Sequence, residues 1–270
     1  MEPDARTQHP APPVSDFAGT AGFYARYRPT YPEGVWDLLV DEADLGETSS
    51  VLDLGCGPGT ATLPLARRAG QVTAVDAEPE MLDQGRMAAA AAELGNVRWV
   101  HGTAETFDGE PGAYQLVVIA SAFHWMDRPA VAAKCHRLTA PGGLLAVVGN
   151  PTPLLQIRQR DGVGATIADV QERWFGDGTF PLTTETLAEP AEIIRASPFA
   201  SADVVHVPCR QDWDVERFIG FLQSTSSRPY QRLGDRFTTF ADEVERAVRA
   251  IEPTGRWSLE GSIEITLATR

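Results

Sequence analysis

The chain has 270 residues, of which 43% are hydrophobic, and it carries a formal net charge of −14. This composition is ample for a folded core, and no stretch approaches the roughly 18 consecutive apolar residues that a membrane span requires. The negative charge would repel DNA or RNA at long range and no basic cluster offsets it, which argues against a nucleic-acid partner.

The first residues, MEPDARTQHPAPPVSDF, predict a flexible tail over residues 1–18 because they are rich in Pro, Ala and polar side chains. They lack the basic start and the apolar run of a signal peptide, so we expect a cytoplasmic protein. Cys56, Cys135 and Cys209 form no CxxC pair, and their spacing predicts neither a zinc site nor a disulfide framework.

From about residue 49 to 150, short apolar runs alternate with helical stretches. Strands are predicted at Ser50–Leu54, Val72–Val75, Val97–Val100, Gln115–Ser121 and Leu144–Val148, the last of them after a turn at Pro141–Gly143. Helices are predicted at Thr60–Ala69, Pro79–Leu94 and Arg128–Leu138. The alternation indicates a doubly wound α/β fold, in which a parallel sheet has helices on both faces.

The second half of the chain has a different pattern. Residues 151–200 are too many for an ordinary connection of about 2–6 residues, and Ile167, Val170 and Trp174 have helical spacing. The same spacing recurs from Val215 to Leu222 and from Phe237 to Ile251, whereas Val204–Cys209 and Ile263–Leu267 are predicted to be the last two strands of the sheet. We expect one domain over residues 19–270, with its cofactor-binding core at about 45–150 and its helical lid and substrate elements at about 19–35, 151–200 and 210–255.

A glycine-rich turn, VLDLGCGPGT, follows the first predicted strand. Gly55, Gly57 and Gly59 would let the backbone turn sharply and approach a ligand closely. Asp76 ends the next strand, 21 residues beyond Gly55 (76 − 55). An acid about 20 residues past such glycines is placed to accept hydrogen bonds from ribose hydroxyl groups.

Two details of this turn favour S-adenosylmethionine over a nicotinamide dinucleotide. The third glycine of a GxGxxG motif is replaced by Thr60, and Asp53 lies two residues before Gly55. A carboxylate beside a pyrophosphate would be repulsive by about 1–4 kcal/mol, whereas it would attract a ligand that carries an ammonium and a sulfonium group.

The ordered motifs DLGCGPG, VDAEPEML, HGTAETF and VIASAFHWMD resemble those of class I S-adenosylmethionine-dependent methyltransferases. The resemblance is to the small-molecule branch that contains ubiquinone-type and trans-aconitate-type enzymes, and the segment FYARYRPTYP is similar to the one that precedes the first strand in the trans-aconitate-like group. It covers about residues 22–150 and implies a seven-stranded, mostly parallel Rossmann-like sheet with helical lid insertions in the C-terminal half.

The resemblance also implies roles by position. Asp53, Gly55 and Gly57 would contact the methionine part of the cofactor, Asp76 the ribose, Ala77 and Met81 the adenosine, and Thr103, Ala104 and Glu105 the adenine edge. Ala120 would offer its carbonyl to the methionine ammonium, and Arg28, with Tyr24 beside it, would bind the methionine carboxylate. Many relatives carry Asp where this chain has Thr103. Met81 could instead be a core residue, and Arg28 and Tyr24 could simply pin the N-terminal segment.

His124 is the candidate general base, because it follows the fourth predicted strand and an imidazole titrates near neutral pH. The alternative is a histidine that only positions the acceptor. Tyr27, Phe123, Trp125 and Trp174 are predicted to line the substrate pocket with it, although aromatic side chains at helical spacing, Trp174 in particular, are often core. No carboxylate follows the fourth strand before Asp127, so we expect a metal-independent reaction.

The sequence therefore predicts methyl transfer from S-adenosylmethionine to a small-molecule acceptor. Two alternatives remain open: a nicotinamide-dependent oxidoreductase, and a non-catalytic member of the fold that binds S-adenosylhomocysteine. The acceptor atom and the oligomeric state do not follow from the sequence.

Overall fold

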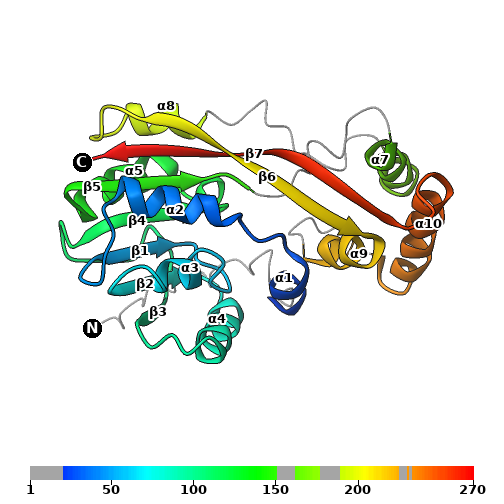
Figure 1. Cartoon of the computed structure of the whole chain (residues 1–270), viewed down its shortest axis with the longest axis horizontal. Coiled ribbons are helices and arrows are strands. Elements are labelled where there is room, and N and C mark those ends of the chain that lie inside the picture. Colours follow the sequence, from blue (N-terminus) through cyan, green and yellow to red (C-terminus); the bar gives the residue numbers. More distant parts are fainter. Residues whose placement is uncertain (1–20, 151–161, 177–188, 225–229, 231–232) are drawn as a thin grey trace, which may run out of the picture.

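Seven strands form one sheet in the order β3-β2-β1-β4-β5-β7-β6 in the computed structural model of the chain, which describes residues 21–150, 162–176, 189–224, 230 and 233–270 (Figure 1). The strands are β1 (Ser50–Leu54), β2 (Gln71–Asp76), β3 (Val97–His101), β4 (Tyr114–Ala120), β5 (Thr139–Val148), β6 (Asp203–Asp214) and β7 (Arg256–Thr269). β1 to β5 are parallel, β7 is antiparallel to β5, and β6 is antiparallel to β7. The predicted doubly wound, mostly parallel sheet is confirmed.

The chain has helices on both faces of this sheet and others beyond it, beside the outer part of β6 and β7. They are α1 (Ala21–Tyr27), α2 (Glu33–Glu42), α3 (Thr62–Ala66), α4 (Pro79–Ala91), the short 3₁₀ helix η1 (Phe123–Trp125), α5 (Arg128–Leu138), α7 (Gly162–Phe175), α8 (Pro190–Arg195), α9 (Val215–Gln223) and α10 (Arg236–Ile251). α2 and α3 pack on one face through side chains such as Trp36 and Leu65, and α5 and α8 pack on the other through Val131 and Ile194. Because helices cover the sheet on both faces, the sequences of its central strands are continuous apolar runs.

Two elements of the first half differ from the prediction. α3 has only five residues, and beyond its last residue, Ala66, the Asn96 side chain takes part in fixing the chain: it donates hydrogen bonds to the carbonyls of Ala66 and Ala69, at 2.8 and 3.0 Å. The expected turn at Pro141–Gly143 is a bulge inside β5, since Tyr114 pairs with Thr139 but Leu116 pairs with Leu144. Extra residues of this kind bend a strand without ending it.

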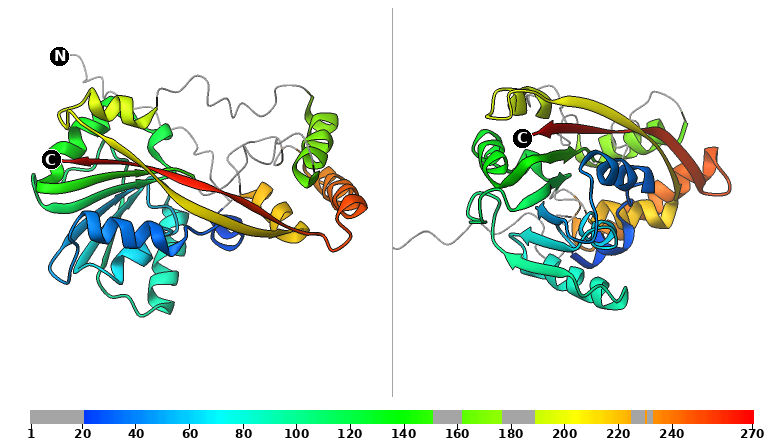
Figure 2. Two further views of the ribbon diagram at one scale, coloured as in Figure 1. Left: turned by 45° about the horizontal axis from the view of Figure 1, so that its top comes forward. Right: turned by 60° about the vertical axis from the view of Figure 1, so that its left-hand side comes forward.

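β6 and β7 are much longer than predicted. Twelve residue pairs join them, from Asp203 with Leu267 to Asp214 with Arg256, whereas β5 pairs only with the last five residues of β7. The outer half of this ribbon therefore extends past the sheet and leads to α9 and α10 (Figures 1 and 2). A separate aromatic cluster, which contains Phe218 and Phe240, fills the space between the ribbon and helices α7, α9 and α10.

The predicted tail at residues 1–18 and much of the lid region predicted at 151–200 lie outside the described residues. Helices occur where periodicity predicted them in the second half, at α7, α9 and α10. Among the described residues, no helix is both long enough and apolar enough to cross a bilayer.

Gly85 in α4 lies so close to β3 that a larger side chain would clash with it. A stability prediction follows from this contact. A Cβ atom at Gly85 would lie 2.4 Å from Cη2 of Trp99. We expect Gly85→Ala to lower the free energy of unfolding by about 1–3 kcal/mol in urea denaturation, because the added methyl group must displace the ring of Trp99. This cost exceeds the gain in helix propensity from glycine to alanine.

Gly22→Ala in α1 is the matched control, because a Cβ there meets nothing within 4 Å in the part of the chain that the structure describes. Equal stability of the two variants would contradict a tight contact between α4 and Trp99.

Candidate functional site

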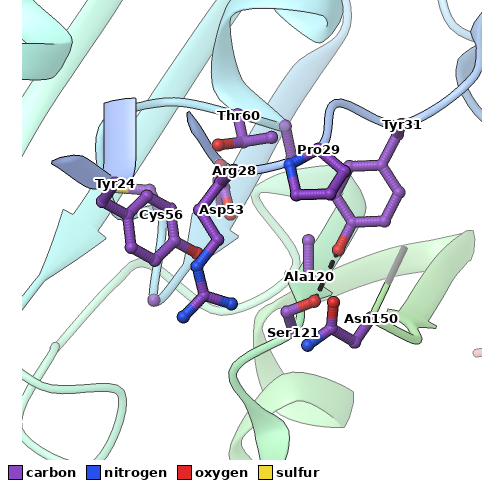
Figure 3. A pocket seen from close by; sticks show the side chains of 12 residues that line it. Tyr24, Arg28, Pro29, Tyr31, Asp53, Cys56, Thr60, Ala120, Ser121 and Asn150 are labelled. Atoms are coloured by element: carbon purple, nitrogen blue, oxygen red, sulfur yellow. Dashed lines mark hydrogen bonds between the residues drawn. The ribbon is translucent and has the colours of Figure 1, made fainter. Parts of the chain in front are cut away.

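A pocket opens at the carboxyl ends of β1 and β4, where the strand order reverses direction (Figure 3). Ligands of open α/β sheets bind at this switch point. The pocket is lined by Tyr24, Arg28, Pro29, Tyr31, Asp53, Gly55, Cys56, Thr60, Ala61, Ala120, Ser121 and Asn150. Five of these, Tyr24, Arg28, Asp53, Gly55 and Ala120, were predicted from the sequence as cofactor-binding residues.

The turn after β1 forms the floor of the pocket. The backbone N–H groups of Gly55 and Cys56 both donate to the carbonyl of Val75, at 2.8 and 3.0 Å, and this fixes the turn against β2. Gly55 has a φ of +73°, and a Cβ atom there would lie 2.5 Å from the Cβ of Ala122. Glycine is therefore required both by the backbone conformation and by the close approach of the segment that follows β4.

Asp53 is completely buried at the end of β1. Its Oδ2 accepts a hydrogen bond of 2.6 Å from the hydroxyl of Thr62, whereas its Oδ1 has no hydrogen-bond partner among the described residues. Burial, with a smaller contribution from the negative charge of Asp76, raises the pKa of Asp53 to about 7, although hydrogen bonds from Thr62 act in the opposite direction. The site thus holds a carboxyl group that lacks a cation.

Asp76, at the end of β2, has a structural role that its spacing did not reveal. Its Oδ2 accepts from the N–H of Gly57 at 2.7 Å, and its Oδ1 accepts from the N–H of Glu78 at 2.9 Å. The carboxylate therefore joins the glycine turn to the start of α4, and each oxygen keeps a second lone pair for a ligand. Burial raises the pKa of Asp76 above its ordinary value.

Arg28 links the pocket to α9. Its Nε donates to Oγ of Ser224 at 3.0 Å, and its Nη2 donates to the carbonyl of Ser224 at 3.1 Å. The guanidinium also lies 4.7 Å from the ring centre of Tyr24 and 5.1 Å from that of Phe221. Arg28 and Tyr24 thus do pin the N-terminal segment, and they also line the pocket, so a cofactor contact by either stays a prediction.

A pair of hydroxyl groups on the opposite wall was missed by the sequence analysis. Tyr31 Oη and Ser121 Oγ share a hydrogen bond of 2.8 Å, drawn as a dashed line in Figure 3. Burial raises the pKa of Tyr31, so its phenol stays protonated and can donate. Ser121 has a φ of +53°, a left-handed conformation that is uncommon for residues other than glycine and that recurs at functional sites.

The residues predicted to contact the adenosine lie outside the pocket lining. Met81 and Ala104 are buried, and Ala104 belongs to the core cluster under α5. The backbone carbonyl of exposed Ala77 lies 3.1 Å from a ring nitrogen of His101. Thr103 bonds with Thr106, and Glu105 accepts from the N–H of Asp127 at 2.9 Å, so these residues order the loops after β3 and η1.

The three aromatic residues of η1 have different environments. Phe123 is buried in the core cluster that α5 covers, so the structure places it in the core and not on the pocket wall, where it was predicted. Trp125 is 54% exposed, and its ring lies 5.1 Å from that of His124. Partial desolvation and the positive charges of Arg128 and Arg28 lower the pKa of His124, so its imidazole is neutral at pH 7.

The remaining two predicted wall residues belong to helix packing. Tyr27 of α1 lies against Gly220 of α9, where a Cβ atom would come within 2.4 Å of its ring. Trp174 donates from Nε1 to Oε2 of Glu243 at 2.7 Å, and its ring centre lies 5.5 Å from that of Phe240. Trp174 is therefore part of the contact between α7 and α10, and its predicted place beside the pocket is not observed.

Within the described ranges, no three His, Cys, Asp or Glu side chains are arranged to hold a metal ion. Metal independence itself stays a prediction, because it concerns the reaction.

Sequence comparison finds a known kind of domain in the middle of the chain, and this domain includes the glycine turn and the end of β4. A family model described as "Methyltransferase domain" matches residues 51–143. Uncharacterised methyltransferases of Mycobacterium bovis and Mycobacterium tuberculosis are each 37% identical over 134 residues, which are 50% of this chain and 51% of each relative. An uncharacterised methyltransferase-like protein of Schizosaccharomyces pombe is 35% identical over 128 residues. The matched segment spans about half the length of these curated relatives.

Solved structures show the same fold across most of the chain. A provisionally assigned type II methyltransferase from Anaeromyxobacter dehalogenans has a TM-score of 0.55 at 22% identity, over 90% of this chain and 97% of that one. Phosphoethanolamine N-methyltransferase 2 of Haemonchus contortus, in complex with phosphomonomethylethanolamine and S-adenosylhomocysteine, has a TM-score of 0.53 at 16% identity, over 93% of this chain and 56% of that one. At such identities the likeness shows the fold alone.

The buried carboxyl group makes a prediction about stability and pH. The pKa of Asp53 is raised in the folded chain, so the stability it contributes is complete below its unfolded pKa near 4 and is lost as the pH rises through about 7. Asp53→Asn removes this titration. We therefore expect the difference in unfolding free energy between the variant and the original chain to change by about 2–3 kcal/mol in favour of the variant when the pH rises from 5 to 8.

Urea denaturation of both proteins without ligand, at the two pH values, measures this change. Titrating groups that do not interact with Asp53 cancel in the difference. A stability difference that is the same at pH 5 and pH 8 would show that Asp53 does not titrate in this range.

Proposed function

We propose that this chain, which carries a class I methyltransferase domain as its motifs predicted, transfers a methyl group from S-adenosylmethionine to a small-molecule acceptor. The observation that supports this most directly is the buried carboxyl group of Asp53, whose Oδ1 has no partner in the described structure and lies on the pocket formed by the glycine turn. A buried carboxylate needs a positive partner, and S-adenosylmethionine carries two positive groups.

Each charged part of that cofactor has a complementary group around the pocket. The methionine ammonium would lie between Asp53 and the carbonyl of Ala120, the methionine carboxylate near Arg28, and the ribose hydroxyls at the free lone pairs of Asp76. Gly55 and Gly57 would allow close approach of the methionine part, as the resemblance implies. The nicotinamide alternative is disfavoured because a pyrophosphate would lie against the buried carboxyl group of Asp53, which has no bonded cation among the described residues.

The bound cofactor supplies a methyl group already activated by the sulfonium. The acceptor attacks the methyl carbon in line as the carbon–sulfur bond breaks, and sulfur keeps the electron pair. The protein then has to hold the two reactants in line, exclude water and accept a proton where the acceptor loses one. Tyr31 and Ser121 offer hydroxyl groups that can orient an acceptor, and the neutral imidazole of His124 can take its proton.

A small acceptor fits the charge of the chain better than nucleic acid does. With a net charge of −14, the protein repels polyanions at long range. α1 and α9, which Arg28 joins through its bonds to Ser224, would cover the pocket during transfer. Closure of this kind excludes water from the reacting groups.

Cofactor binding and its dependence on Asp76 can be measured by calorimetry. We expect one S-adenosylhomocysteine per chain, and we expect Asp76→Ala to weaken binding by about 1–3 kcal/mol through loss of charge-assisted bonds to ribose. Asp83→Ala is the matched control, because Asp83 is exposed on α4 and pairs with Arg86. Binding of NAD in place of S-adenosylhomocysteine would contradict the proposal.

His124 generates a prediction about the chemical step. With an acceptor identified by release of S-adenosylhomocysteine, His124→Ala should lower the single-turnover rate by about 10²–10⁴-fold and leave cofactor affinity nearly unchanged. Because the pKa of His124 lies below its ordinary value, the rate should rise with pH and level off below neutrality in the original protein only.

A small rate loss with an unchanged pH profile would instead make His124 a positioning residue. That outcome would favour an acceptor that is already ionised, such as a carboxylate, which needs no base. An equal loss of rate and cofactor affinity would mark His124 as structural.

A further inference from the structure

The two oxygens of the Asp53 carboxyl group have different surroundings. Oδ2 is bound by the hydroxyl of Thr62, the first residue of α3, and both side chains are 0% exposed. Oδ1 has no hydrogen-bond partner within the described ranges, and Asp53 lines the pocket. The group is thus held from the helix side, and its second oxygen is buried without a partner beside the pocket.

We propose that Thr62 is a positioning residue that sets the pH range of cofactor binding, because it holds Asp53 so that the ligand ammonium replaces a proton on Oδ1. This inference rests on the proposed function. In the exchange, the O–H bond of the neutral carboxyl group breaks, the proton passes to the solvent, and the carboxylate that remains bonds to the ammonium N–H. No other reactant is required.

Among the groups that face Asp53, Thr62 is the neighbour that stabilises its carboxylate form. Asp76 of β2 is negative and opposes ionisation of Asp53. Burial raises the pKa values of Tyr24 and Tyr31, so both are neutral. The thiol of Cys56, in the turn, is neutral for the same reason. Arg28 lines the same pocket, but two of its nitrogens are bound to Ser224.

Thr62 acts on Asp53 through both its hydroxyl and its backbone N–H, and both favour the carboxylate. Loss of the hydroxyl alone should therefore raise the pKa of Asp53 further. A hydrogen bond to a charged group corresponds to about one to two pKa units, so the shift is large enough to measure. A threonine that served only as core packing would have no such effect on titration.

The experiment is calorimetric titration with S-adenosylhomocysteine from pH 5.5 to 8.5, in paired buffers of different ionisation enthalpy that count the protons released. For the original protein we expect affinity to fall about tenfold per pH unit below a midpoint near 7, with release of about one proton at pH 6. Thr62→Val should move the midpoint up by about one to two pH units and weaken binding by about five- to fiftyfold at pH 7. Thr62→Ser should restore the original midpoint.

Asp53→Asn is the control for the titrating group, and it should bind weakly with no linked proton release. A midpoint for Thr62→Val that equals the original one would overturn the proposal, as would a serine variant that behaves like valine. If the valine variant does not fold, Thr62→Ala tests the same shift. Failure of the original protein to bind S-adenosylhomocysteine at any pH would instead refute the proposed function.

Discussion

The carboxyl group of Asp53 is buried without a cation at the point where β1 ends, and the site is organised around that constraint. Removal of a carboxylate from water costs several kcal/mol unless a partner compensates. Within the described chain, Thr62 compensates only one of its oxygens. Burial of this carboxyl group therefore costs the unliganded protein stability at neutral pH, and under the proposed function a cationic ligand would compensate that cost. Local rules of packing are broken in this way where function requires it.

The surrounding structure keeps that place open. Val75 and Asp76 hold the glycine turn against β2 through its backbone N–H groups, so the turn cannot collapse onto Asp53. The ring of Trp99 packs against Cys56 of the turn and against Gly85 of α4, and in this way it supports the turn. On the far side, Ser121 and Tyr31 fix the end of β4 to the segment before α2. The residues at the ends of β1 and β4 thus belong to the sheet, which positions ligand groups more accurately than loops do, whereas the turn and the N-terminal segment complete the pocket around them.

Local patterns in the sequence predicted the sheet and the glycine turn, because strand alternation and φ > 0 positions are encoded within a few residues. They did not predict the contacts that complete the pocket. Tyr31 and Ser121 are 90 residues apart, and Arg28 and Ser224 are 196 apart, so no local spacing relates them. Phe123 was predicted to line the pocket because it follows the fourth strand, and Trp174 because it is an aromatic residue of the predicted lid. Neither pattern reveals which side chains pack inward, and the structure packs both against hydrophobic clusters. The outer half of the ribbon of β6 and β7 was also missed, because the polar run Arg210–Asp212 interrupts the apolar pattern of β6 and Gly261 and Ser262 interrupt that of β7.

A crystal structure of the protein with S-adenosylhomocysteine tests the central claim most directly. The account predicts the methionine ammonium within hydrogen-bond distance of Asp53 Oδ1, the ribose hydroxyls on the carboxylate of Asp76, and Thr62 still bound to Asp53 Oδ2. A ligand whose ammonium lies away from Asp53, with Oδ1 still unpartnered, would contradict it.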